Sequence, residues 1–307
     1  MAYVYNAPLH RFAIFTAACT LLLVVAGALV TSNDAGLAVP DWPLSYGSLM
    51  PPMVGGVFYE HGHRMVATFV GMLTIALAVW LQLREPRRWM RRLGWVALGA
   101  VILQGLLGGL TVLFFLPRPV SIAHASLAQL FFCATVAIAL FTSRWWLDEA
   151  EQYRGAASDE VRRFAVAMAV VVFFQLVLGA SFRHKAVGIL PHILWAVVVL
   201  AFSITLSRKV RVHFPKIEPL RKIAALVAAL VGTQMLLGLA AWGSRLANAE
   251  LPQPMPLMVG FTVAHVAVGA ATLGAAVLAA LCCYRLLPPE IKSERSAPAT
   301  ALQRSES

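Results

Sequence analysis

Glu60-His61-Gly62-His63-Arg64 runs directly into the apolar stretch Met65–Leu83. That stretch is long enough to cross a bilayer as a helix, which needs roughly 20 apolar residues. Charged and metal-binding side chains at the mouth of such a helix are costly to place there, so they indicate a functional site. A histidine near the start of a long apolar segment occurs three more times along the chain.

The composition predicts a membrane protein. Of the 307 residues, 60% are hydrophobic and 13% are charged, and the mean hydropathy is +0.75. A soluble domain has about a quarter of its residues charged. Apolar segments can be marked at about 12–31, 63–83, 94–116, 122–143, 164–182, 190–207, 223–242 and 259–284. We therefore expect an all-α polytopic membrane protein with eight transmembrane helices.

Lys and Arg are divided unevenly between the two sets of loops. The loops after the second, fourth and sixth segments are basic, and so are the two ends of the chain. By the positive-inside rule, both termini face the cytoplasm and the histidine-headed ends face outward. This bias accounts for the net charge of +11 without a nucleic-acid partner. The cations expected on the outer side are Arg64, Arg118, Arg183, Lys185 and Arg245.

Three further features concern a possible cleavage site, the C-terminal tail and the cysteines. Ala26-Gly27-Ala28 resembles a signal-peptidase site, but cleavage there would remove one member of an internal repeat, so we expect the first segment to be retained. Residues 288–307 are rich in Ser, Ala, Pro and charge and are expected to form a disordered cytoplasmic tail. No disulfide framework is expected, because every cysteine falls inside an apolar segment: Cys19, Cys133, Cys282 and Cys283.

The odd-numbered segments share a short phrase that defines the repeat. It reads Gln104-Gly105-Leu106-Leu107-Gly108 in the third segment, and Gln175–Gly179 and Gln234–Gly238 follow the same pattern. The first segment has Val24-Val25-Ala26-Gly27, without the glutamine. Each phrase is followed by an outer loop and a helix with one histidine near its outer end. We expect four helical hairpins forming two pseudosymmetric four-helix halves, 1–150 and 151–287. The glycines allow close helix approach, and the glutamines either bond across helices or serve the site.

The histidines of the repeat are His63, His124, His192 and His265. Neutral imidazole is the usual protein ligand of heme iron, and helical bundles build cofactor sites from facing side chains. We expect two heme sites at one depth, formed by His63 with His124 and by His192 with His265. Zinc is less suited, because no third ligand recurs with each pair. A lone histidine at a helix mouth is more often an interfacial polar residue, but fourfold repetition favours ligands. No site is expected at His10, His184 or His213.

Glu60 distinguishes the first pair from the second. At about 100° per residue, Glu60, His63 and Arg64 share one face of a helix, whereas His61 points elsewhere. Such a carboxylate can accept a proton or stabilise a developing cation, so the first pair is the expected reactive site. The alternative is an acid favoured by the helix dipole and paired with Arg64. The preceding loop, 32–59, is rich in Pro, Gly and aromatic residues and is expected to be an ordered cover.

These residues resemble the heme A synthase family of cytochrome oxidase assembly. The most specific element is Glu60 followed, after two residues, by His63-Arg64, together with the Asp41-Trp42-Pro43 loop. His124, His192 and His265 match the other ligand positions in order. The resemblance extends over nearly the whole chain. Many bacterial members carry a cysteine pair in the first outer loop, but residues 32–59 of this chain contain none, so no thiol role is possible there.

The resemblance implies an activity and its assignments. The family oxidises a ring methyl of heme O to the formyl group of heme A, through a hydroxymethyl intermediate. His63 and His124 would bind the substrate heme, His192 and His265 would bind a permanent heme b cofactor, and Glu60 would be the catalytic carboxylate. The implied setting is the bacterial cytoplasmic membrane, with membrane lipid, heme O synthase, cytochrome oxidase assembly factors or a second copy of the chain as partners.

Two other functions remain open at this point. One is a non-enzymatic di-heme b electron-transfer protein, and the other is a transporter or heme-handling assembly factor. The single depth of the histidines is unlike an electron path across a membrane. Glu60 beside only one pair is unexpected for both alternatives. Identification of the bound hemes discriminates among them.

Overall fold

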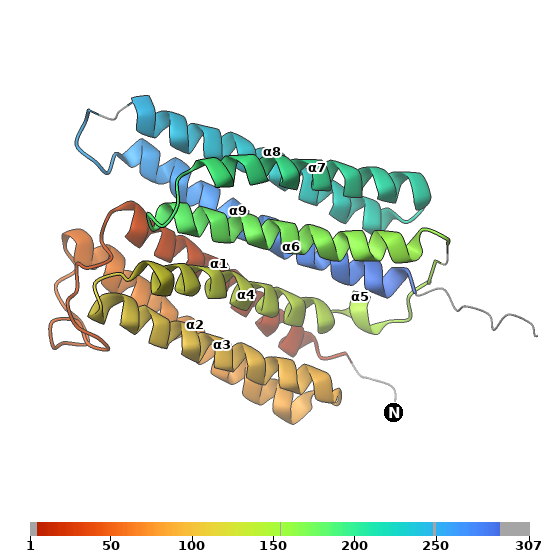
Figure 1. The fold of residues 1–307 in the computed structure, drawn as a ribbon. Helices are drawn as coiled ribbons and strands as arrows, with labels where there is room; N and C mark the ends of the chain where they lie inside the picture. Colours follow the sequence, from red (N-terminus) through yellow and green to blue (C-terminus); the bar gives the residue numbers. More distant parts are fainter. Residues whose placement is uncertain (1–4, 154, 248–249, 289–307) are drawn as a thin grey trace, which may run out of the picture.

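The computed structural model describes residues 5–153, 155–247 and 250–288 (Figure 1). These residues form long, closely packed helices, of which eight are long and apolar enough to cross a membrane. The prediction of eight transmembrane segments is confirmed in this respect. The long helices are α1 (Ala7–Ser32), α2 (Gly55–Arg84), α3 (Arg88–Leu113), α4 (Arg118–Phe141), α6 (Ser158–Arg183), α7 (Leu190–His213), α8 (Glu218–Ala247) and α9 (Pro256–Leu286). The tail expected at 288–307 lies outside the described residues, apart from Pro288.

The helices begin where the chain offers suitable first residues. Asn6 caps α1 by accepting the N–H of Leu9 at 3.1 Å. Proline stands in the first turn of α1, α4, α7 and α9, where its missing N–H costs nothing. Proline therefore starts three of the four helices that carry a repeat histidine.

Two boundaries differ from the expected ones in ways that matter for the site. Helix α2 begins at Gly55, eight residues before the expected start, so Glu60–Arg64 lie inside the helix. Helix α3 ends at Leu113 rather than near residue 116, because Phe115 and Leu116 adopt left-handed backbone angles, with φ of 55° and 58°. A single-turn helix, α5 (Arg144–Leu147), follows α4 and was not predicted.

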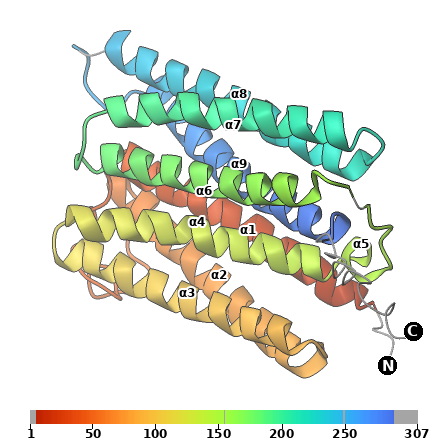
Figure 2. The ribbon, with the colours of Figure 1, turned by 45° about the vertical axis from the view of Figure 1, so that its right-hand side comes forward.

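The helices pack in two rings of four. In the first ring, α1 contacts α2 and α4, and α3 completes the circle; in the second, α6 contacts α7 and α9, and α8 completes it. The rings meet where α9 packs against α1 and α4, and where α4 packs against α6 (Figure 2). Phe132 of α4 lies over Gly274 of α9, where an added Cβ would stand only 3.1 Å from the ring. Glycine at 274 thus lets the two rings approach closely.

The four helices that carry the repeat histidines all begin at one end of the bundle. This is the end that holds the α1–α2 loop (residues 33–54), whereas α1 begins and α9 ends at the opposite end (Figure 1). Each repeat histidine lies within the first ten residues of its helix. At about 1.5 Å of rise per residue, all four are within roughly 15 Å of that end.

Candidate functional site

Each repeat histidine packs against the final glycine of the preceding phrase. A Cβ added to Gly179 or Gly238 would lie 3.0 Å from Cε1 of His192 or His265, respectively. The corresponding distances are 3.2 Å from Gly27 to His63 and 3.3 Å from Gly108 to His124. The imidazoles therefore occupy space that only a glycine leaves open. The expectation that these glycines permit close approach is refined: the group that approaches is the ligand side chain of the next helix.

The glutamine of the phrase bonds to the same histidine residue. Gln104, Gln175 and Gln234 each donate through Nε2 to the backbone carbonyl of His124, His192 and His265, at 2.9, 2.9 and 2.8 Å. The interpretation that the glutamines bond across helices is confirmed. In α1 the equivalent position is Leu23, which has no polar group to offer His63. One of the four units therefore lacks this bond.

The C-terminal pair has the separation that one metal ion between two imidazoles requires. The ring centroids of His192 and His265 are 6.1 Å apart, with ring planes at 77°. Two metal–nitrogen bonds of about 2 Å, plus about 1 Å from each nitrogen to its ring centre, give roughly 6 Å. Nδ1 of His265 lies 3.0 Å from the Gln234 carbonyl, an outer contact typical of metal-ligating histidine. Nε2 of His265 also lies 3.3 Å from Gln234 Nε2, a contact that an iron bond would replace.

The N-terminal pair lies on α2 and α4, which are diagonal in the first ring. Nδ1 of His63 and Nδ1 of His124 are buried, with no hydrogen-bond partner in the described part of the chain, and the same holds for Nδ1 of His192. These nitrogens lie on the glycine side of each ring, 3.3–3.8 Å from where an added Cβ would stand, so the neighbouring helix covers them and they do not mark the position of a ligand. Within the described ranges, no group of three or more His, Cys, Asp or Glu could hold a metal. Two-histidine sites for heme iron therefore fit these residues better than a zinc site does.

Residues of the motif Glu60–Arg64 contact two different parts of the structure, the neighbouring helix α1 and the α1–α2 loop. Whereas His63 faces Gly27, the side chain of Glu60 is buried and bonded to the α1–α2 loop. Its Oε2 accepts the N–H of Val39 at 2.8 Å, and its Oε1 accepts Arg64 Nη2 at 2.7 Å. The pairing of Glu60 with Arg64 weighed from the sequence is therefore present. It is part of a larger contact that holds the loop.

Arg64 and His61 complete the contact between α2 and the loop. Arg64 Nη1 donates to the carbonyls of Asp41 and Leu44 at 2.8 and 2.9 Å. Nδ1 of His61 lies 2.8 Å from Ser45 Oγ. The prediction that His61 points away from the target of His63 agrees with this geometry. Its contact with Ser45 could not be read from helical spacing alone.

The loop is also ordered internally and packed on α3. The Asp41 carboxylate accepts the N–H groups of Tyr46 and Gly47 at 2.7 and 2.8 Å. The bond from Gly47 is the main cause that lowers the pKa of Asp41. The Trp42 ring lies on Gly109, where an added Cβ would stand 2.7 Å from it. The α1–α2 loop is thus an ordered segment fixed over the N-terminal ring of helices, as its composition predicts.

Two of the cations expected on the outer side, Arg64 and Arg183, bond to other elements of the fold. Arg64 is engaged as described, and Arg183 donates to Ser32 Oγ at 3.1 Å, which links the end of α6 to the end of α1. Next to it, burial and the neighbouring Arg183 lower the pKa of His184. The structure assigns no propionate partner among them.

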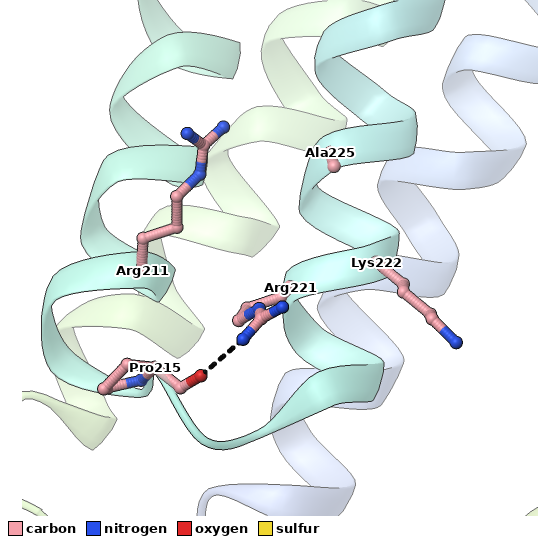
Figure 3. Close-up of a pocket in the computed structure, with 5 residues that line it drawn as sticks. All are labelled: Arg211, Pro215, Arg221, Lys222 and Ala225. Atoms are coloured by element: carbon pink, nitrogen blue, oxygen red, sulfur yellow. Dashed lines mark hydrogen bonds between the residues drawn. The ribbon is translucent and has the colours of Figure 1, made fainter.

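A shallow hollow of about 440 Å³ lies between α7 and α8 at the opposite end of the bundle, lined by Arg211, Pro215, Arg221, Lys222 and Ala225 (Figure 3). Arg221 donates to the Pro215 carbonyl at 2.9 Å, and the Lys222 side chain points away from Arg211. With cations but no imidazole, this hollow is distinct from the histidine sites.

Comparison with known proteins places the chain. Residues 10–55 and 54–191 match the sequence model of the COX15-CtaA family, described as cytochrome oxidase assembly protein, and these residues make up more than half of the chain. The chain belongs to this family. The matched residues include Glu60, His63 and His124 but end one residue before His192. The assignment of the C-terminal pair therefore depends on the repeat and on the geometry above.

Curated relatives agree with the family. The heme A synthase of Symbiobacterium thermophilum is 31% identical over 183 residues, which cover 57% of this chain and 59% of that protein. The heme A synthase of Shouchella clausii is 30% identical over 182 residues, again 57% and 59%. The chain thus spans about three fifths of the length of the relatives it matches. The resemblance inferred from the motif reaches further along the chain than these alignments do.

Proposed function

We propose that this protein is a heme A synthase, a membrane oxidoreductase that converts heme O to heme A by oxidising a ring methyl to a formyl group through a hydroxymethyl intermediate. The observation that carries the proposal is the difference between the two histidine pairs. Among the described residues, only the N-terminal pair has a buried carboxylate one turn before a histidine, and that carboxylate bonds to the α1–α2 loop. Membership of the family and the names of its relatives support the same activity.

The two rings of helices would take different roles. Residues 1–150 would bind the substrate heme through His63 and His124, and residues 151–287 would bind heme b through His192 and His265. Supporting this division, the pattern of helix contacts is unchanged when α1–α4 are exchanged with α6–α9. We infer a pseudosymmetric bundle in a bacterial cytoplasmic membrane, with cytoplasmic termini and outward-facing histidines. Its apolar outer surface would admit the lipid-soluble heme O and release heme A.

The heme iron, when bound, supplies the redox chemistry, and the chain supplies position and proton handling. His63 and His124 would hold the substrate between diagonal helices. Glu60, as the catalytic carboxylate, would accept a proton or stabilise positive charge through Oε2, which now accepts the Val39 N–H. Arg64 would orient Glu60 through Oε1 and would hold the loop that excludes water. Release of the Val39 bond would then free Oε2 for its chemical role.

A non-enzymatic di-heme b electron-transfer protein is the second candidate. The similar glycine and glutamine contacts of the two pairs favour it, because they give both sites the same ligand type. A transporter or heme-handling assembly factor has less support, since neither role needs Glu60 beside one pair only. Heme O synthase, cytochrome oxidase assembly factors and a second copy of this chain are the partners that the proposed activity implies.

Analysis of bound heme tests the proposal. The protein would be co-expressed with a heme O supply, purified, and its hemes extracted and identified by mass spectrometry. Heme A or its hydroxymethyl precursor alongside heme b is expected. Heme b alone, in equal amounts at both sites, would refute the synthase and favour the electron-transfer protein.

A further inference from the structure

The fourfold contact between glycine and histidine has a consequence for how firmly each heme is held. We define a histidine socket as the final glycine of a repeat phrase, which contacts the next histidine, together with the residue four positions before that glycine. Three sockets contain glutamine and one contains Leu23. The sockets are Leu23/Gly27, Gln104/Gly108, Gln175/Gly179 and Gln234/Gly238.

The glycine controls where the imidazole lies. In all four sockets Cε1 is the ring atom nearest the glycine, and Nδ1 is the next nearest. In the sockets of His63, His192 and His265, Nε2 also lies 3.7–3.9 Å from the added Cβ, so the glycine sets how closely the whole imidazole approaches the neighbouring helix. An alanine at 179 or 238 would place Cβ 3.0 Å from Cε1, so the ring would have to move by a few tenths of an ångström.

The glutamine controls the height of the histidine along its helix. Its amide ties the histidine's own carbonyl to the neighbouring helix, so the two helices cannot slide past one another at this level without losing a hydrogen bond. Contacts outside the ligand set orient metal ligands, and this one acts on the backbone of the histidine rather than on its ring. At His63 this contact is replaced by an apolar side chain.

The sockets of the two halves differ in their glutamines. Both C-terminal sockets contain a glutamine that bonds to the histidine carbonyl. Of the N-terminal sockets, only that of His124 has this bond, because Leu23 stands in place of glutamine in the socket of His63. The N-terminal pair therefore has one fewer bond that fixes a ligand-bearing helix.

We propose that the histidine sockets are positioning elements which set the strength of heme ligation, and that the glutamine-free socket of His63 makes the N-terminal pair the exchangeable heme site. This rests on the proposed function, because it takes the histidine pairs to be heme ligands. An enzyme whose substrate and product are both hemes needs one site that releases its heme and one that does not. The residues of the sockets make the N-terminal and C-terminal heme sites different, although both are built from the same helical repeat.

The first experiment tests positioning at the C-terminal site. Gly238→Ala is compared with Gly232→Ala, a control on the same helix where an added Cβ meets nothing within 4 Å. Heme b content, the electron paramagnetic resonance spectrum and the midpoint potential of the purified proteins are measured. Gly238→Ala is expected to lose heme b or to shift the spectrum and potential, with Gly232→Ala like the wild type. Gln234→Leu is expected to lower heme b affinity measurably, because it removes the amide bond to the His265 carbonyl, and it provides a second readout if Gly238→Ala does not accumulate.

The second experiment tests exchange at the N-terminal site. Transfer of heme from the purified protein to excess apomyoglobin is followed by absorbance. Leu23→Gln, which adds the missing donor, is expected to slow the exchanging phase, and Gln104→Leu to accelerate it. Leu22→Gln adds the same group at a position 62% exposed on the outer surface of α1 and should leave the rate unchanged.

The failures can be told apart. Wild-type spectra in Gly238→Ala and Gln234→Leu, or equal exchange rates in Leu23→Gln and Gln104→Leu, would overturn the socket inference while the heme sites stand. If His192→Ala and His63→Ala also retain the full heme complement of the wild type, the proposed heme sites themselves are wrong.

Discussion

Replacement of Glu60 by alanine should release the α1–α2 loop (residues 33–54) from α2. The Glu60 side chain is only 5% exposed, and its two oxygens accept the Val39 N–H and the Arg64 guanidinium. Alanine leaves that amide without its acceptor and that cation without its partner. Breaking a buried pair costs roughly 3–5 kcal/mol. Because Arg64 is 17% exposed and keeps its bonds to Asp41 and Leu44, we expect a smaller cost of about 2–3 kcal/mol.

That free energy has a direct readout in hydrogen exchange. At about 1.4 kcal/mol per factor of ten, the loop should open roughly 30- to 150-fold more often. Deuterium uptake by peptides from residues 33–54 should rise accordingly in Glu60→Ala, while peptides from α6 and α7 stay unchanged. Glu60→Gln keeps an oxygen that can accept the Val39 N–H but removes the charge, so its uptake should fall between those of wild type and alanine.

The same two variants separate the loop contact from catalysis. If the charge of Glu60 is needed for chemistry, Glu60→Gln should stop formyl formation even though it retains most of the loop order, and both variants should keep bound heme. Unchanged deuterium uptake across residues 33–54 in Glu60→Ala would refute the contact inferred from the structure. Full product formation by Glu60→Ala would refute the catalytic role.

Three further predictions concern the other parts of the site. His192→Ala and His265→Ala should each lose the heme b spectrum, because one imidazole remains where two are needed; a normal heme b spectrum in both would overturn this assignment. Trp42→Ala should weaken the loop by roughly 1–3 kcal/mol, less than a fully buried tryptophan, since its ring packs on Gly109 but is 37% exposed; increased chymotrypsin cleavage after Leu44 or Tyr46 would show it, and unchanged cleavage would contradict it. The pKa of Asp41 is lowered in the folded loop. The stability that its carboxylate gives the loop is therefore fully present above the ordinary pKa of about 3.9 and is lost as the pH falls through the lowered pKa. Pepsin cleavage within the loop should therefore increase at low pH in the wild type, and Asp41→Asn should lack that acid-dependent step.

Much of the site was accessible from the sequence because the repeat is local. Hydrophobic length predicts each spanning helix, since a bilayer requires about the same number of apolar residues everywhere. The repeated phrase ending in Gly108, Gly179 or Gly238 can be recognised in the sequence, and so can the histidine that follows each one. Which glycine would touch which histidine was not accessible, because that depends on how each hairpin closes.

The motif around Glu60 shows where sequence reasoning stops. Helical spacing separates His61 from His63, since the two side chains lie about 160° apart around one helix. It cannot show that Glu60, His61 and Arg64 all bond to residues 39–45. Those contacts form only when the α1–α2 loop folds back over the first turns of α2. The early start of α2 at Gly55 is part of the same structure and is hidden by the polar residues before Met65.

The sequence by itself determined the number of spanning helices, the repeated histidines and the single acid beside one of them, because apolar length and residue order are properties of the chain alone. Only the tertiary structure decided that the rings of His192 and His265 lie 6.1 Å apart, that glycine and glutamine contact the histidines, and that Glu60 is engaged by the loop. The physical reason is that these features arise between segments. A close approach or a buried hydrogen bond exists only once two helices, or a helix and a loop, have packed together.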